Sequence, residues 1–121
     1  LLHDIGKVQS MKMKLSAEPT NTGRLIGHSC LGRDILRQAI TEMPVFDEVL
    51  QMKLEHIILC HQGTPAKGAD TKPKFPEALL VHYIDEMDGK LEIMGQIIAK
   101  NISGESWSDD RNIFRTELFN Y

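Results

Sequence analysis

The sequence is poor in aromatic residues and cysteines, and it contains no long apolar run. It has one tryptophan, two tyrosines and four phenylalanines in 121 residues, so its core should consist mostly of Leu, Ile, Val and Met. Its two cysteines, Cys30 and Cys60, are too few for a disulfide framework and lack the CxxC spacing of zinc and redox motifs. No apolar run approaches the roughly 20 residues of a membrane-spanning helix. We therefore expect a protein of the reducing cytoplasm that has no membrane segment.

The sequence also lacks a strong excess of one sign of charge. The 14 basic and 17 acidic residues are interspersed, the net charge is −3, and the chain has no basic tail or arginine-rich stripe. The formal charge thus gives no support to nucleic-acid binding, although a bound metal ion would make the local field positive. A chain of this length with 41% hydrophobic residues can bury one ordinary core, which predicts a single domain over residues 1–121. Because it begins at Leu1 and not at a methionine, we expect it to be a piece of a longer protein.

No run of strand length alternates between apolar and polar residues, and the apolar residues recur at steps of three and four instead. This period is typical of amphipathic helices, so the predicted fold class is all-α. We predict three main helices, over residues 23–43, 46–62 and 76–100. The chain should begin with the end of a helix, over residues 1–8, and finish with a short helix over residues 109–119. Loops are predicted where no periodic pattern is found, over residues 9–22, 63–74 and 101–108.

The first chemical signal is the stretch Leu1-Leu2-His3-Asp4-Ile5-Gly6-Lys7. The adjacent imidazole and carboxylate of His3 and Asp4 can both face one divalent cation. Lys7 lies one helical turn further on, where it can reach an anion bound to that cation. This pattern favours metal-assisted phosphoester chemistry. Taken by itself, however, a single His-Asp pair near a frayed terminus is better explained by chance.

Two further histidines change that balance. His28 and His61 each replace an apolar residue on the inward face of a well-patterned helix, and a buried imidazole without a partner is costly. One such case is usually a hydrogen-bonded core histidine. Together with the His-Asp pair and with Asp85, at the edge of the apolar face of a third helix, they predict a shared metal ion. Nitrogen and oxygen ligands without thiolate favour iron, manganese, cobalt, nickel or magnesium over a structural zinc.

These motifs together resemble the HD superfamily of metal-dependent phosphohydrolases, which implies an HD-domain helical bundle. The residues that carry the resemblance are His3-Asp4 followed by Gly6-Lys7, Gly27-His28, His61 in residues 58–63, and Asp85 in residues 83–90. The chain more narrowly resembles the HD domain of YhaM-type 3′-to-5′ exoribonucleases. That likeness rests on residues 23–28, 60–63, 76–78, 85–90 and 107–121.

The resemblance implies a role for each matching residue. The metal ligands it implies are His3, Asp4, His28, His61 and Asp85. Asp4 would bridge two metal ions and Lys7 would contact the scissile phosphate, so these two are the expected catalytic residues. One or two divalent ions are expected per site, Mn²⁺ or Fe²⁺ in the first place and Mg²⁺, Co²⁺ or Ni²⁺ as alternatives.

The chain departs from the family pattern in two ways. The superfamily's first histidine, on the preceding helix, and the upstream OB-type RNA-binding domain of this subfamily lie outside the sequence. Within it, Gln62 occupies a position where related exonucleases often carry a second histidine.

The implied function is hydrolysis of single-stranded RNA, or DNA, from the 3′ end. A nucleotide phosphohydrolase is one alternative, although the Gly-Tyr-Pro signature of cyclic-dinucleotide phosphodiesterases is missing. The other alternative is a degenerate HD domain acting as a signalling or interaction module, against which the intact ligand set and Lys7 argue.

Overall fold

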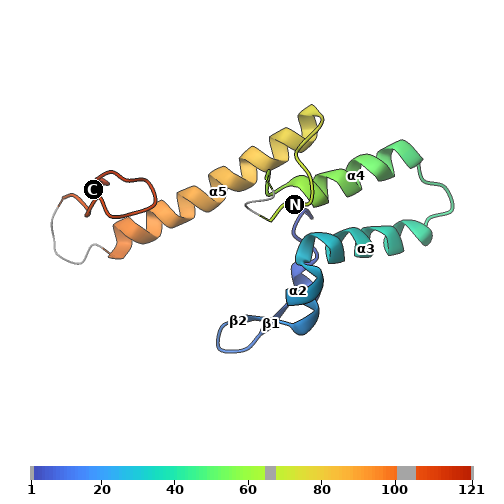
Figure 1. Cartoon of the computed structure of the whole chain (residues 1–121), viewed down its shortest axis with the longest axis horizontal. Coiled ribbons are helices and arrows are strands. Elements are labelled where there is room, and N and C mark those ends of the chain that lie inside the picture. Colours follow the sequence, from blue (N-terminus) through green and yellow to red (C-terminus); the bar gives the residue numbers. More distant parts are fainter. Residues whose placement is uncertain (1, 65–67, 101–105, 121) are drawn as a thin grey trace. The chain divides into compact units, whose positions relative to one another are not determined.

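A computed structural model describes residues 2–64, 68–100 and 106–120 (Figure 1). In these residues the chain forms five helices and one two-stranded antiparallel sheet. Their bounds are α1 Lys7–Ser10, β1 Met11–Met13, β2 Ala17–Pro19, α2 Asn21–Ile26, α3 His28–Thr41, α4 Glu48–Cys60 and α5 Pro76–Lys100. The predicted all-α class is therefore confirmed, with one small hairpin added to it. None of the helices described is both long enough and apolar enough to cross a membrane.

The chain divides into two compact units, residues 1–83 and 84–121, and the boundary falls inside α5. The first unit contains all elements up to the first two turns of α5. The second contains the rest of α5 and a closed loop, in which Trp107 and Phe119 form an isolated bridge. The amide of Ser108 donates to the carbonyl of Leu118 inside that loop, at 2.9 Å.

The core of the first unit lies between α3 and α4. Leu31 and Ile40 of α3 and Ile58 and Cys60 of α4 are buried there. The side chain of Asp47 accepts a hydrogen bond from the Leu50 amide at 2.6 Å, and this N-cap fixes the start of α4. The amphipathic pattern and the cap together explain why the helix predicted over residues 46–62 is found at Glu48–Cys60.

A polar contact joins the same two helices. Arg37 of α3 donates two hydrogen bonds to the carboxylate of Glu55 on α4, at 2.8 and 2.7 Å, and Gln51 donates a third at 2.9 Å. The hydrogen bonds from Arg37 lower the pKa of Glu55 although its burial opposes the shift. A buried carboxylate without these donors would be costly, so the pair fixes how α3 lies along α4.

The N-terminal turn lies directly against α3. A Cβ atom added to Gly6 would overlap the carbonyl oxygen of His28 and would come within 2.6 Å of the Gly32 amide nitrogen. Only glycine leaves room for two backbones to approach so closely. Gly6 therefore brings the residues around it to the N-terminal end of α3.

Replacing Gly6 by alanine should consequently lower the free energy of unfolding by about 1–3 kcal/mol, because the backbone must move to admit the methyl group. Urea denaturation followed by circular dichroism would measure this change. Gly89 on α5 provides a control, because nothing lies within 4 Å of a Cβ atom added there. Gly89→Ala should raise stability by about 0.5–1 kcal/mol. Equal stability of the Gly6 variant and the parent would contradict the close contact.

The prediction that residues 9–22 form a loop is wrong. This stretch contains the end of α1, the β1–β2 hairpin and the start of α2. In the hairpin Met11 pairs with Pro19, Lys12 with Glu18 and Met13 with Ala17. Each strand has only three residues, which is too short for an alternating pattern to be recognised.

The single helix predicted over residues 23–43 is also wrong. Gly27 has a φ of 82°, a backbone conformation that residues other than glycine rarely adopt, and it separates α2 from α3. Thr20 caps α2 by accepting a hydrogen bond from the Gly23 amide at 2.9 Å, so this helix starts at Asn21. As a result, Leu25 does not continue the apolar face of α3 and is exposed.

The predictions for the two ends of the chain need correction as well. Residues 3–6 form turns, and the helix beside them begins at Lys7 and ends at Ser10. The last helix predicted over residues 109–119 is absent from that segment, because the side chains of Asp109 and Asn112 bond to nearby backbone groups and hold turns.

Residues 76–100 form one helix as predicted. The loop predicted over residues 63–74 is confirmed for its described part, and most of the break predicted over 101–108 lies outside the described residues.

Candidate metal centre

Five of the six predicted site residues belong to the first unit, where three separate segments carry them. His3 and Asp4 lie in the turn before α1, and Lys7 is the first residue of that helix. His28 is the first residue of α3, directly after Gly27, and His61 follows the last residue of α4. The sixth residue, Asp85, lies on α5 in the second unit, and its role as a ligand stays a prediction.

The carboxylate of Asp4 is the centre of this cluster. Its Oδ2 accepts a hydrogen bond from Lys7 Nζ at 2.5 Å and lies 3.6 Å from His3 Nε2. Its Oδ1 lies 3.4 Å from His28 Nε2 and 3.6 Å from His61 Nε2. That oxygen is buried and has no hydrogen-bond partner among the described residues. A buried oxygen of this kind needs an explanation, and a cation held between it and the two imidazoles is one.

The charge state of Asp4 suits such a cation. Burial by itself would raise the pKa of the carboxyl group. The hydrogen bond and charge of Lys7, with smaller contributions from His3 and His61, outweigh burial and lower the pKa below its ordinary value. Asp4 is therefore an anion at neutral pH, and its Oδ1 offers a lone pair to an ion.

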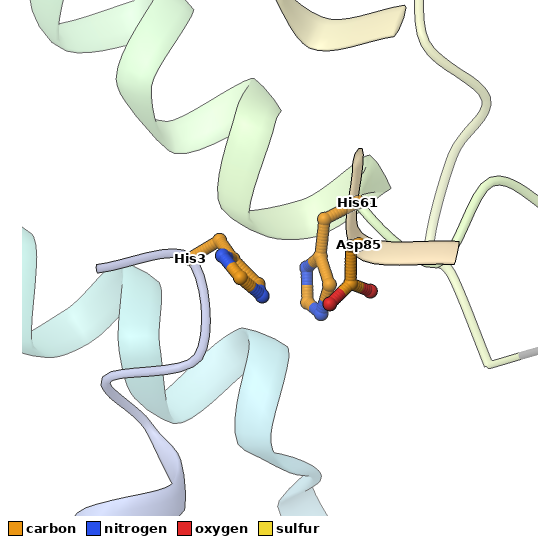
Figure 2. A group of neighbouring side chains, drawn as sticks. All are labelled: His3, His61 and Asp85. Carbon is orange, nitrogen blue, oxygen red and sulfur yellow. The ribbon is translucent and has the colours of Figure 1, made fainter. Parts of the chain in front are cut away.

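The histidine from α4 is oriented by its own backbone. The side chain of His61 is buried, and its Nδ1 lies 2.7 Å from the carbonyl oxygen of Ile58. In the neutral ring this contact requires the proton on Nδ1, so Nε2 carries a lone pair toward Asp4 and His28. Metal-binding histidines are commonly held by a backbone carbonyl in this way. The ring of His3 lies beside the ring of His61, with centroids 4.9 Å apart (Figure 2).

Asp4 Oδ1 and the two imidazole nitrogens that face it have the spacing of a metal site. His28 Nε2 and His61 Nε2 are 3.4 Å apart, and Asp4 Oδ1 is 3.4 and 3.6 Å from them. A circle through three points at these separations has a radius of about 2.0 Å, which matches metal–ligand bonds of about 2.0–2.2 Å to imidazole and carboxylate. The residues present therefore fit a divalent ion. The nearby thiol of Cys60 bonds to the Ile57 carbonyl at 3.7 Å instead, so the donors are nitrogen and oxygen.

Two residues outside the predicted ligand set contact the cluster. Nδ1 of His82 lies 2.8 Å from the carbonyl oxygen of His61, where it donates a hydrogen bond and fixes the backbone of that residue. Nε2 of Gln62 lies 3.1 Å from Nε2 of His28. No pattern in the sequence indicates the His82 contact, because it depends on the return of the chain between α4 and α5. Gln62 is noticeable in the sequence only as a departure from the family pattern.

Comparison with known proteins agrees with this geometry. Residues 1–90 match the HD domain family. The chain therefore belongs to that family of metal-dependent phosphohydrolases. Within it, the chain is similar to two proteins called 3′-5′ exoribonuclease YhaM, from Bacillus licheniformis and from Bacillus subtilis strain 168. Each is 33% identical to this chain over 105 residues.

Those 105 residues make up 87% of this chain but only 33% of either relative. The chain thus spans about a third of the length of the curated relatives it matches. No solved structure matches it significantly.

Proposed function

We propose that this chain is the catalytic domain of a divalent-metal-dependent phosphodiesterase that removes nucleotides from the 3′ end of single-stranded RNA. The observation that carries the proposal is the buried Oδ1 of Asp4, which faces the Nε2 atoms of His61 and His28. The choice of RNA and of the 3′ end rests on the names of the two relatives.

The proposed ligands are His3, Asp4, His28, His61 and Asp85. Asp85 joins this set because the family motif has an aspartate at its position. It also follows His82 by three residues on the continuous helix α5, and residues at this spacing share one face of a helix. When bound, the ions would lower the pKa of water and offset negative charge on the phosphate. Mn²⁺ or Fe²⁺ suits the nitrogen and oxygen donors best.

Lys7 is proposed to stabilise charge on the substrate. Its side chain is half exposed although its Nζ is bonded to Asp4 Oδ2, so the ammonium group lies at the border between the cluster and solvent. A cation placed there can donate to a phosphate oxygen while it keeps its contact with Asp4. Charge stabilisation of this kind acts most strongly on the transition state, where the phosphate oxygens carry the most negative charge.

A labelled single-stranded RNA tests the proposal. The protein is loaded with Mn²⁺, its metal content is measured by elemental analysis, and it is incubated with an oligonucleotide labelled at the 5′ end. We expect a ladder of labelled products that shorten one nucleotide at a time, and no products with EDTA or with Asp4→Asn. Release of the label as a mononucleotide would overturn the 3′-to-5′ polarity. A metal-loaded protein that leaves RNA intact would overturn the proposed function.

A further inference from the structure

A cavity of about 690 Å³ lies beside the β1–β2 hairpin. Its lining residues are Lys7, Val8, Met11, Lys12, Met13 and Ala17, all of which belong to the first unit. Cavities that bind small molecules commonly measure about 300–1,000 Å³, so the size suits one nucleotide. Lys7 belongs both to this cavity and to the Asp4 cluster, which makes the cavity an extension of the candidate metal centre.

Four of the six residues that line the cavity are apolar, and the other two are lysines. Val8 and Met13 are 74% and 78% exposed, although apolar side chains of this size are normally buried. Exposed apolar groups that gather at a concave surface are typical of a binding site. No acidic residue is among the lining residues, and Lys7 and Lys12 make the cavity attractive to an anion.

We propose that this cavity binds the nucleoside next to the scissile phosphate of a single-stranded polynucleotide. This inference rests on the proposed function. The thioethers of Met11 and Met13 would contact the base, since sulfur packs favourably against aromatic rings and does so with little dependence on base identity. Lys12 would bind the phosphate on the 5′ side of this nucleoside.

The position of Lys7 sets the direction of the strand. A phosphate held at Lys7 lies next to Asp4, whose Oδ2 is 2.5 Å from Lys7 Nζ. The nucleoside then extends along the hairpin, away from α3. A single strand fits this arrangement because its base is not paired and can lie flat against the apolar lining. The hairpin thus gives the domain a means of holding single-stranded nucleic acid that its net charge of −3 does not provide.

Binding in the absence of metal provides the first part of the test. Fluorescence anisotropy with a labelled single-stranded RNA of ten nucleotides, in EDTA, measures affinity without hydrolysis. We expect Lys12→Ala to weaken binding about fivefold and to reduce the salt dependence, by about 0.7 in the slope of log K against log salt. Met13→Ala should weaken binding about 2- to 12-fold, as expected for the loss of a sulfur–ring contact.

Lys14→Ala is the matched control. Lys14 belongs to the same hairpin, is exposed and is paired with Glu18 at 2.7 Å, but it does not line the cavity. Circular dichroism shows whether each variant is folded. Binding that is equally weakened by Lys12→Ala and Lys14→Ala would overturn the inference, because charge on the hairpin surface would then explain it. Unchanged binding by Lys12→Ala and Met13→Ala would overturn it as well.

Hydrolysis of bis(p-nitrophenyl) phosphate with Mn²⁺ separates this inference from the proposed function. This small diester reports on the metal centre and has no second nucleoside to fill the cavity. If the inference holds, Lys12→Ala lowers the rate on RNA relative to the rate on the small diester. If Lys12→Ala hydrolyses both substrates with the same ratio of rates as the parent protein, the proposed nucleoside site is wrong and the proposed function still stands. Failure to hydrolyse either substrate would overturn the function, whatever the binding measurements show.

Discussion

Lys7→Ala should lower the turnover of RNA by about 100- to 1,000-fold and leave the metal content of the protein almost unchanged. The size of the effect is that of removing one charge-stabilising donor from an active site. Metal should remain because the proposed ligands are imidazoles and carboxylates, and Lys7 contacts the Oδ2 of Asp4 and not the Oδ1 that faces His28 and His61. Single-turnover kinetics with saturating enzyme, together with elemental analysis, would measure both quantities.

The control for this variant is again Lys14→Ala. Both lysines have 56% of their side-chain surface exposed, and each is paired with a carboxylate, but Lys14 lies on the hairpin and its partner is Glu18. Lys14→Ala should therefore keep its turnover. Loss of metal from the Lys7 variant would mean that this lysine holds the site together, and a catalytic role for it would have to be abandoned.

His61→Ala should reduce the affinity for Mn²⁺ by at least about 100-fold. Changes to groups that merely orient a metal ligand cost about 10- to 100-fold, and removal of a buried ligand should cost more. The loss should be large because the ring of His61 is already fixed by the Ile58 carbonyl, with its Nε2 3.6 Å from Asp4 Oδ1. Titration calorimetry of the metal-free proteins with Mn²⁺ would measure the change.

His56→Ala is a control on the same helix. Nε2 of His56 accepts a hydrogen bond from the Lys74 amide at 3.2 Å, and its ring packs near Phe75, away from Asp4. Its loss should leave Mn²⁺ affinity unchanged. If His61→Ala binds Mn²⁺ as the parent protein does, His61 is a structural histidine and the candidate centre is wrong.

The sequence predicts those elements whose signals are local. Helix α4 begins after Asp47, whose side chain caps it, and α5 begins at Pro76, so both starts can be recognised without the fold. The hairpin cannot be recognised in this way, because its strands are too short to show alternation. The break at Gly27 is hidden for another reason: apolar residues on both sides of it continue the spacing of a single helix.

In the candidate site, too, some features have local signals in the sequence and others depend on the fold. His28 and His61 are noticeable in the sequence because each interrupts an apolar pattern, and they are among the residues that the first unit brings together. What holds them in place is not predictable from the sequence. The contact of His82 with the His61 carbonyl depends on how distant segments pack. The close approach of Gly6 to His28 does so too, and a glycine in a turn normally indicates only local geometry.

The separation of the donors along the chain has a consequence for folding kinetics. Asp4, His28 and His61 come from three segments that are far apart along the first unit, so they meet only after α3 and α4 have paired and the N-terminal turn has docked. Contacts between such distant segments form late, because closing long loops costs entropy before any contact is gained. An ion bound between these donors would stabilise the native state but not the folding transition state. It would therefore slow unfolding and leave the folding rate nearly unchanged, so that metal loading sets the lifetime of the folded domain.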